Sequence, residues 1–248
     1  MRRADGSASA RPALGDRKLH SCPFGSHLEW YWSMGEALFS RIREGIQLDE
    51  VGLVAVKPEL DALRCAGRLP GRTALDAFAG IGGSAIALAR TGKRVLSLDL
   101  NPTRLRMARN NARVYEVESR ILFARADTRQ LLGRVEVDAV YLDPPWGGME
   151  AAEAAHFGLQ DFTPAGDALL TAALASASHV ALSVPPNFEF SELERFHPEL
   201  VVPAIYEGEI LYYDVFFRRV GRARLGFRRT PQRASGVAGP AESERART

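Results

Sequence analysis

From residue 72 onward, short and long hydrophobic segments alternate along the chain, and this alternation limits the possible folds more than any other feature. Short apolar runs rich in β-branched residues predict strands, whereas apolar side chains at a period of 3.6 residues predict helices. The expected strands are residues 73–78, 94–98, 121–124, 137–142 and 179–184, and the expected helices are residues 84–90, 102–114 and 165–177. Such an alternation predicts a mostly parallel sheet covered on both faces. Residues 200–206 and 209–217 should add an antiparallel pair that turns at Glu207-Gly208.

The chain before residue 72 is predicted to be a leader followed by a small helical extension. The first 27 residues are rich in Arg, Ala, Ser, Gly and Pro with little periodicity, which is typical of a disordered segment. Helical spacing then connects Trp30, Tyr31, Met34, Leu38, Phe39 and Ile42. Gly45 is expected to end this helix, residues 46–56 to be extended, and Pro58 to open a short helix through Leu63. The predicted organisation is a leader (1–27), a helical extension (28–70), a main domain (71–220) and a basic disordered tail (221–248).

Composition restricts the compartment and the partners. The chain has 248 residues, 46% of them hydrophobic, and a net charge of only +2, so it builds one substantial core and is not a polycation. Arginines nevertheless crowd the last part of the chain, at Arg218, Arg219, Arg222, Arg224, Arg228, Arg229 and Arg233, a run that suits either phosphate contacts or a solvated tail. Cys22, Cys65 and the five histidines lack ligand spacing, so we expect neither a disulfide framework nor a metal. Without a long apolar run or a secretory signal, we expect an intracellular protein, cytoplasmic, or nuclear in a eukaryote.

The fourth predicted strand, residues 137–142, ends on the motif DPPWGG. The Asp143 carboxylate and the Pro144 carbonyl both accept hydrogen bonds, so together they can hold an exocyclic amine. Trp146 offers a flat face on which a base can stack, an interaction that contributes roughly 1–3 kcal/mol. A tight turn with Trp146 packed inward is the structural alternative.

A glycine-rich turn, DAFAGIGG, follows the first predicted strand and opens the first predicted helix. Gly80 and Gly82 let the backbone approach a ligand at the helix N-terminus. The carboxylate of Asp76 would repel a pyrophosphate but attract the ammonium of a methionyl group. Asp99 ends the next strand, at the place where an acid binds ribose hydroxyls. Asp127 follows the third strand in a similar way and could bind an adenine amine. A dinucleotide also fits a lone glycine turn, and helix capping is an alternative for Asp99 and Asp127. Combined with the DPPW motif, this order of acids predicts a site for the cofactor S-adenosylmethionine.

Several segments taken together resemble the trimethylguanosine synthase family, the guanine-N2 methyltransferases that act on RNA caps. The likeness runs from about residue 30 to residue 217, over LFSR (38–41), GIQLD (45–49), DAFAGIGG (76–83), ARNNA (108–112) with Val114-Tyr115, and PPWGG (144–148). The resemblance implies an α/β fold: a Rossmann-like class I S-adenosylmethionine-dependent methyltransferase with a mostly parallel seven-stranded sheet, an antiparallel last strand and a small N-terminal helical extension.

The resemblance also implies roles for individual residues. Those expected to contact S-adenosylmethionine are Phe78, Asp99 and Asp127. Trp146 is expected to stack on the guanine, with Asn111 near it, and Asn187 is a further substrate-binding candidate.

Three positions depart from the pattern of the eukaryotic cap enzymes of this family. Asp143 replaces the usual Ser before Pro-Pro-Trp. Pro186 replaces an Arg that helps to hold the methylated cap, and Lys57 replaces a Thr before Pro-Glu. The departures leave the cofactor prediction intact but weaken the prediction of a 7-methylguanosine cap as the substrate.

The residues predict in-line methyl transfer to the exocyclic amine of a purine, most simply the N2 amine of guanine in RNA. The family resemblance implies a cap substrate, converted from 7-methylguanosine to the 2,7-dimethyl or 2,2,7-trimethyl product. The catalytic residues would be Asp143, Pro144 and Trp146. An Asp-Pro-Pro-aromatic motif suits any exocyclic amine, so guanine N2 or adenine N6 in uncapped ribosomal or transfer RNA, or in DNA, stays open. A non-catalytic RNA-binding module is a further alternative, although the complete set of acids argues against it. RNA is the expected partner, with no membrane, and a monomer is favoured.

Overall fold

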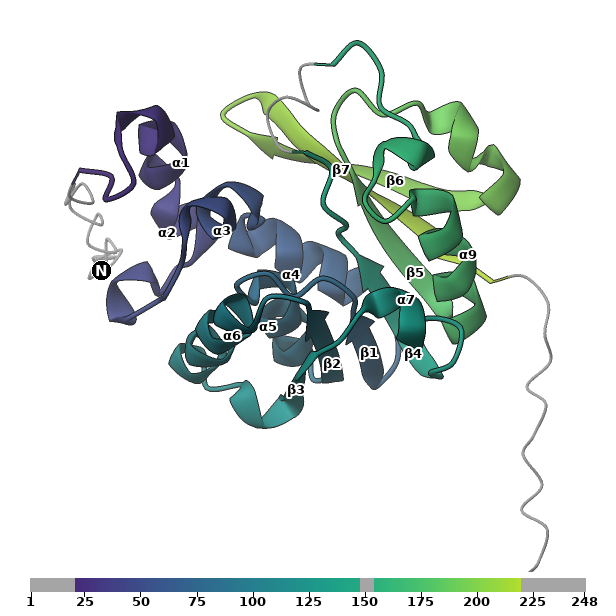
Figure 1. The fold of residues 1–248 in the computed structure, drawn as a ribbon, viewed down its shortest axis with the longest axis horizontal. Coiled ribbons are helices and arrows are strands. Elements are labelled where there is room, and N and C mark those ends of the chain that lie inside the picture. Colours follow the sequence, from purple (N-terminus) through teal and green to yellow (C-terminus); the bar gives the residue numbers. More distant parts are fainter. Residues whose placement is uncertain (1–20, 148–153, 220–248) are drawn as a thin grey trace, which may run out of the picture.

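The computed structural model describes residues 21–147 and 154–219, and its centre is a seven-stranded sheet (Figure 1). The strands are β1 Thr73–Asp76, β2 Arg94–Asp99, β3 Ile121–Arg125, β4 Val137–Leu142, β5 Ala177–Val184, β6 Pro198–Tyr206 and β7 Glu209–Arg218. They lie in the order β3-β2-β1-β4-β5-β7-β6. The first five run parallel, whereas β7 is antiparallel to both β5 and β6. The predicted fold class is confirmed.

Helices cover both faces of this sheet, as the alternating pattern predicts. The longer ones are α4 Glu59–Arg68, α5 Gly83–Arg90, α6 Pro102–Val114 and α9 Gly166–Ser176. Buried side chains of α4, α5 and α6 form one hydrophobic cluster with Tyr141, Ala181 and Phe216 of the sheet, and we call this side the α4 face. Buried side chains of α9 form a second cluster with Leu142 and Leu182 on the other side, the α9 face. Neighbouring strand residues therefore point to opposite layers.

Short elements join these layers and complete the molecule. They are η1 Ser26–Leu28, α1 Glu29–Ser33, α2 Gly35–Leu38, η2 Ile42–Glu44, α3 Glu50–Ala55, η3 Glu118–Arg120, α7 Thr128–Leu131, η4 Leu159–Asp161 and η5 Phe190–Phe196. Within the described residues, no helix is long and apolar enough to cross a membrane.

The N-terminal helical stripe is broken into short pieces, contrary to the single helix predicted over residues 28–45. The chain turns extended at Phe39, because the backbone amide and the hydroxyl of Ser40 bind Glu59 of α4 instead of continuing a helix. Gly45 adopts a left-handed conformation (φ 97°) and ends the last of these pieces as predicted. The described part of the predicted leader packs Cys22 and Phe24 against the α4-face cluster, while residues 1–20 lie outside the described chain.

The prediction that residues 46–56 are extended is wrong, because α3 occupies residues 50–55. The Asp49 carboxylate caps this helix by accepting a hydrogen bond from the Gly52 amide at 2.6 Å. A Cβ atom on Gly52 would lie 2.6 Å from the Ile81 side chain, so α3 packs directly on the glycine-rich turn. A contact of that kind joins distant parts of the chain and leaves no periodic pattern in the sequence.

Other predicted elements agree closely with the structure. The bounds of α6 and β4 match the predicted ones, and β6 and β7 turn at Glu207-Gly208. Pro58 caps α4, which begins at Glu59 and runs five residues further than Leu63. The short helices α7 and η5 were not predicted. The predicted basic tail, residues 221–248, and Gly148 of the DPPWGG motif lie outside the described chain.

Candidate active site at the ends of the parallel strands

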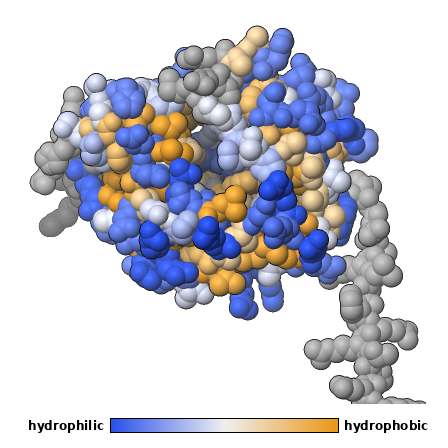
Figure 2. Space-filling model, viewed as in Figure 1, coloured by the Kyte–Doolittle hydropathy of each residue, from blue (hydrophilic) through white to orange (hydrophobic). Residues whose placement is uncertain are grey.

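The structure brings the four predicted acids to one edge of the sheet. Asp76 ends β1, Asp99 ends β2, Asp127 follows β3, and Asp143 follows β4 directly. β1 lies between β2 and β4, so the strand order reverses between β1 and β4. Open α/β sheets bind ligands at such a reversal, beside the carboxyl ends of the strands. Figure 2 shows the surface hollowed between the N-terminal helices and the hairpin of β6 and β7, and the chain after β4 runs beside this hollow in Figure 1.

The glycine-rich turn is held in place by Asp99, and its two predicted glycines do different things. The Gly80 amide donates to the Asp99 carboxylate at 2.9 Å, and the Asn101 amide donates to its other oxygen at 2.7 Å. Gly80 has φ 49° and open space where a Cβ atom would lie, so a ligand can reach its backbone. Gly82 has φ 95°, and a Cβ atom there would lie 3.0 Å from Ala108, so its role is close packing against α6.

Asp76 is a buried carboxylate with one oxygen left over. Its exposed fraction is 0%, and its Oδ2 atom accepts a hydrogen bond from the Ser97 hydroxyl at 2.8 Å. Its Oδ1 atom has no hydrogen-bond partner in the part of the chain that the structure describes. Burial raises the pKa of Asp76 to about 7, and the carboxylates of Asp143 and Asp99 add to this rise. A buried anion with a free oxygen suits a cationic ligand, so this residue fits the methionyl ammonium of S-adenosylmethionine.

Asp127 serves as a helix cap in the structure. Its carboxylate accepts from the Arg129 amide at 2.9 Å and forms an ion pair with the Arg129 guanidinium at 2.6 Å, which holds the pKa of Asp127 below its usual range. It remains partly exposed, so the capping role leaves room for a ligand. Phe78 is also partly exposed and packs against the α9-face cluster. Cofactor contacts of these two residues stay predictions.

The DPPW motif presents two acceptors, the Asp143 carboxylate and the Pro144 carbonyl. The hydroxyls of Ser183 and Tyr141 face the Asp143 carboxylate and help to lower its pKa. Asp143 as a residue is partly exposed, whereas Pro144 is buried. In the described chain the Pro144 carbonyl has no hydrogen-bond donor, whereas the Pro145 carbonyl accepts from the Thr163 amide at 3.2 Å. Burial raises the pKa of Asp143, and the Lys57 ammonium offsets part of that rise. Trp146 packs against the α9-face cluster but stays partly exposed. This position agrees in part with the packing alternative and leaves part of the ring open for the predicted stacking.

The two predicted substrate-binding asparagines hold loops together in the structure. Asn111 is 0% exposed, accepts from the Gln47 amide at 2.7 Å, and donates to the carbonyls of Gln47 and Ile81 at 2.8 and 2.9 Å. It thereby fixes the helical extension to the glycine-rich turn. Asn187 is partly exposed and donates to the Ala154 carbonyl at 2.7 Å. The substrate contacts of both asparagines stay predictions.

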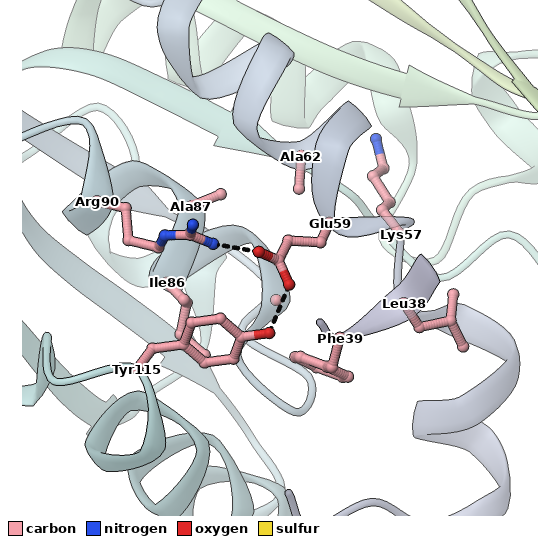
Figure 3. A pocket seen from close by; sticks show the side chains of 10 residues that line it. Leu38, Phe39, Lys57, Glu59, Ala62, Ile86, Ala87, Arg90 and Tyr115 are labelled. Atoms are coloured by element: carbon pink, nitrogen blue, oxygen red, sulfur yellow. Dashed lines mark hydrogen bonds and ion pairs between the residues drawn. The ribbon is translucent and has the colours of Figure 1, made fainter. Parts of the chain in front are cut away.

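Lys57 and Glu59 lie on either side of Pro58 and point in opposite directions, as Figure 3 shows. Glu59 points toward Arg90 of α5 and Tyr115 after α6, and its carboxylate accepts hydrogen bonds from both and from Ser40. Burial alone would raise the pKa of Glu59, but these donors outweigh burial and lower it. This network joins two of the segments, LFSR and Val114-Tyr115, that carry the family resemblance.

The sequence prediction missed a buried ion pair beneath the DPPW motif. The Lys57 ammonium lies 2.6 Å from the Asp214 carboxylate of β7, and each residue is only 5% exposed. The same ammonium lies 4.0 Å from the centre of the Tyr212 ring and 4.9 Å from that of the Tyr141 ring. In the sequence Lys57 is only a departure from the family pattern, and Asp214 is only an acid within a hydrophobic strand, so neither residue indicates the other as its partner.

The sheet order, the glycine-rich turn and the acids at the strand ends together define a class I S-adenosylmethionine-dependent methyltransferase of the Rossmann-like type. Comparison with known structures agrees on the fold: a structure described as a methyltransferase from Porphyromonas gingivalis W83 superposes with a TM-score of 0.60 at 16% identity, over 82% of this chain and 54% of that one.

Sequence comparison specifies the family. A family model described as RNA cap guanine-N2 methyltransferase matches residues 71–213. The trimethylguanosine synthase of Schizosaccharomyces pombe is 30% identical over 196 residues, which cover 73% of this chain and 82% of that protein. The trimethylguanosine synthase of Saccharomyces cerevisiae is 27% identical over 186 residues, which cover 70% of this chain but only 59% of that protein. The chain belongs to the RNA cap guanine-N2 methyltransferase family and is an S-adenosylmethionine-dependent RNA methyltransferase.

Proposed function

We propose that this enzyme methylates the exocyclic N2 amine of guanine in RNA, with a cap guanosine as its substrate. The observation that carries the proposal is the pair of acceptors at the end of β4. The Pro144 carbonyl accepts no hydrogen bond in the described chain, and the Asp143 carboxylate is faced by the hydroxyls of Ser183 and Tyr141. Trp146, which is partly exposed, follows two residues later. Family membership supports guanine N2 as the acceptor, since the matched family is described by that reaction.

Two acceptors and a ring face suit an amine that is a poor nucleophile. The lone pair of the guanine N2 amine is delocalised into the purine ring. Hydrogen bonds from the amine to Asp143 and Pro144 favour a pyramidal nitrogen, whose lone pair then points toward the methyl group. S-adenosylmethionine, when bound, supplies that methyl as an electrophile. Most of the rate enhancement would come from positioning and from a preorganised negative charge, and the amine proton leaves after transfer.

The cofactor would be held at the same sheet edge. The free Oδ1 atom of Asp76 suits the methionyl ammonium, and the open backbone at Gly80 lets the cofactor lie against the turn. Asp99 and Asp127, both partly exposed, are the candidates for the ribose hydroxyls and the adenine amine. A cofactor held in this way would have its methionyl end nearest to β4, where the acceptors of the DPPW motif begin.

A transfer assay with tritiated S-adenosylmethionine tests the proposal. Two RNAs are compared, one with a 7-methylguanosine cap and one uncapped and structured, and the products are digested to nucleosides. Label in N2-methylated cap guanosine is the expected result. Label in internal guanosine or in adenosine would mean that the family chemistry acts on another substrate, and Pro186 would be the first position to examine. Binding of the cofactor without transfer to any RNA would refute an enzymatic role.

Variants separate the two parts of the site. Asp143→Ala should lower turnover by about 100-fold or more, as expected for losing a preorganised contact in the transition state, and should leave cofactor affinity near wild type. Asp167→Ala is the matched control, because this acid binds the amide of Ala168 in its own helix. Equal loss of turnover and cofactor binding in Asp143→Ala would contradict the role of this residue. Trp146→Ala should raise the KM for RNA by about 10-fold or more, and unchanged kinetics would leave only packing for Trp146.

A further inference from the structure

The buried ion pair of Lys57 and Asp214 stands where a hydrophobic contact would be expected. Lys57 precedes α4 and reaches across to β7, with 2.6 Å between its Nζ atom and the Asp214 carboxylate. Both residues are 5% exposed. Removing two charges from water is costly, and a buried pair is often no more stabilising than apolar side chains of similar size. Stability alone therefore gives a weak reason for this pair.

The pair lies in one row with Asp143 across three strands. Leu142 of β4 pairs with Leu182 of β5, so Asp143 follows at the level of Ser183. Ser183 in turn pairs with Asp214 of β7. Residues in register point to the same side of a sheet, and this row lies on the α4 face, from which Lys57 enters. The Lys57 ammonium is thus placed beside Asp214 at the same level as the carboxylate of the DPPW motif.

Several titratable or polar groups in the described chain change the pKa of Asp143, and the cation among them is Lys57. The negative groups are Asp214 on β7 and Asp76 on β1. The hydroxyls of Tyr141 and Ser183 face Asp143 from β4 and β5 and help to lower its pKa. Neither hydroxyl has another hydrogen-bond partner within residues 21–147 and 154–219. The Tyr212 hydroxyl and the Cys65 thiol belong to the same buried group. Asp143 therefore shares the Lys57 ammonium with the Asp214 carboxylate, while Asp76 is a further negative group near Asp143.

We propose that Lys57 and Asp214 are positioning residues that together set the charge state of Asp143. The Lys57 ammonium keeps the Asp143 carboxylate ionised, so that it can accept the hydrogens of the substrate amine. Asp214 fixes the ammonium at this place and limits its effect. The inference rests on the proposed function, since it assigns Asp143 the acceptor role in methyl transfer.

The charges of the pair fit this role. Burial lowers the pKa of Lys57, but the carboxylates of Asp214 and Asp143 outweigh burial and raise it, so the ammonium stays charged. Burial raises the pKa of Asp143, the Lys57 ammonium lowers it, and the Asp214 carboxylate raises it. Removing Lys57 and removing the charge of Asp214 must therefore move the titration of Asp143 in opposite directions.

The test is a direct titration of Asp143 by carbon NMR in protein labelled at the aspartate carboxyl carbons. The Asp143→Asn variant assigns the signal. In Lys57→Met the titration midpoint should rise by about 1 pH unit or more, and in Asp214→Asn it should fall. The double variant, which keeps no uncompensated partner, should lie between them and provides the comparison if Lys57→Met folds poorly.

Lys93→Met is the matched control for deleting a buried lysine. Lys93 is 4% exposed, and its ammonium binds the Ala66 carbonyl at 3.0 Å and the Thr91 hydroxyl at 2.8 Å. Its removal should leave the Asp143 midpoint unchanged. Midpoints that move in the same direction in Lys57→Met and Asp214→Asn, or that do not move, would overturn the inference.

This titration needs neither RNA nor cofactor, so its outcome is independent of the transfer assay. If wild-type protein methylates no RNA but the midpoints reverse as expected, the proposed function fails and the electrostatic role of the pair stands. If wild-type protein forms N2-methylguanosine and the midpoints do not move, only the positioning role fails. Where both hold, the acid limb of kcat/KM should shift with the midpoint, upward in Lys57→Met and downward in Asp214→Asn.

Discussion

The buried carboxylate of Asp76 should destabilise the ligand-free protein, and Asp76→Asn measures by how much. Burial raises the pKa of Asp76 to about 7, whereas an aspartate in an unfolded chain titrates near about 3.9. The difference of about 3 pKa units between the folded and the unfolded state corresponds to about 4 kcal/mol in the free energy of unfolding. The folded state binds the extra proton, so the stability that Asp76 contributes is present at low pH and is lost as the pH rises through about 4 to 7. At pH 8 the carboxylate is ionised in both states, and the whole of this loss in the free energy of unfolding is present.

Asparagine keeps the shape of the side chain and removes its charge. The Ser97 hydroxyl, which donates to Asp76 at 2.8 Å, can rotate to accept from or donate to the new amide. Asp76→Asn should therefore unfold with a higher free energy than wild type, by about 1.5 kcal/mol at pH 5 and up to about 4 kcal/mol at pH 8. The corresponding rise in Tm at pH 8 is at most about 8–16 °C for a chain of this size.

Urea unfolding of both proteins from pH 5 to pH 8, without cofactor, gives the free energies, and calorimetric titration gives the affinity for S-adenosylmethionine. The variant should be more stable and should bind the cofactor more weakly, by about 100-fold for the loss of a buried charge partner. Ser97→Ala serves as the companion, since removing the hydrogen bond to Asp76 should deepen the cost of the carboxylate. A variant Asp76→Asn that is no more stable than wild type at pH 8 would refute the reasoning, even if cofactor binding were lost.

Two further predictions concern the turn and the segments joined to it. Gly82→Ala should lower the free energy of unfolding, measured in urea, by about 2–4 kcal/mol, because φ is 95° and the new Cβ atom would lie 3.0 Å from Ala108. The control is Gly67→Ala, which has open space in a helix and should be neutral or stabilising by up to about 1 kcal/mol. Equal effects of the two variants would contradict the packing argument. Asn111→Ala should cost about 3 kcal/mol, since it leaves the backbone groups of Gln47 and Ile81 without partners; a loss no larger than that of Asn110→Ala would show that these hydrogen bonds matter little.

The elements that sequence patterns predicted best are those whose signals are local. β4 is an apolar strand interrupted only by Asp138, and it stops before Asp143 and the two prolines that cannot continue a ladder. Pro102 opens α6, because proline suits the first turn of a helix. The helix α3 depends instead on the Asp49 cap and on Gly52 packing against Ile81, a contact between residues far apart in the chain. Tertiary packing therefore overrode a sequence that looked extended.

The same distinction applies to the site. Acids at the ends of strands can be placed from sequence, because the carboxyl ends of parallel strands share one edge of the sheet. The partners of Lys57 could not be predicted in this way. Asp214 lies 157 residues further along the chain, and only the pairing of β5 with β7 brings it to the level of Asp143.

The helical extension is part of the site, because the segments that carry the family resemblance bind one another. Asn111 of ARNNA holds Gln47 of GIQLD and Ile81 of the glycine-rich turn, so three of these segments meet at one side chain. A Cβ atom on Gly83 would lie 2.7 Å from Val56, which brings the chain just before Lys57 against the same turn. In the proposed function the turn holds the cofactor and Asp143 accepts from the substrate amine. The packing of Val56 on the turn and the Lys57 ammonium beside Asp214 then connect the proposed cofactor side with the proposed substrate side.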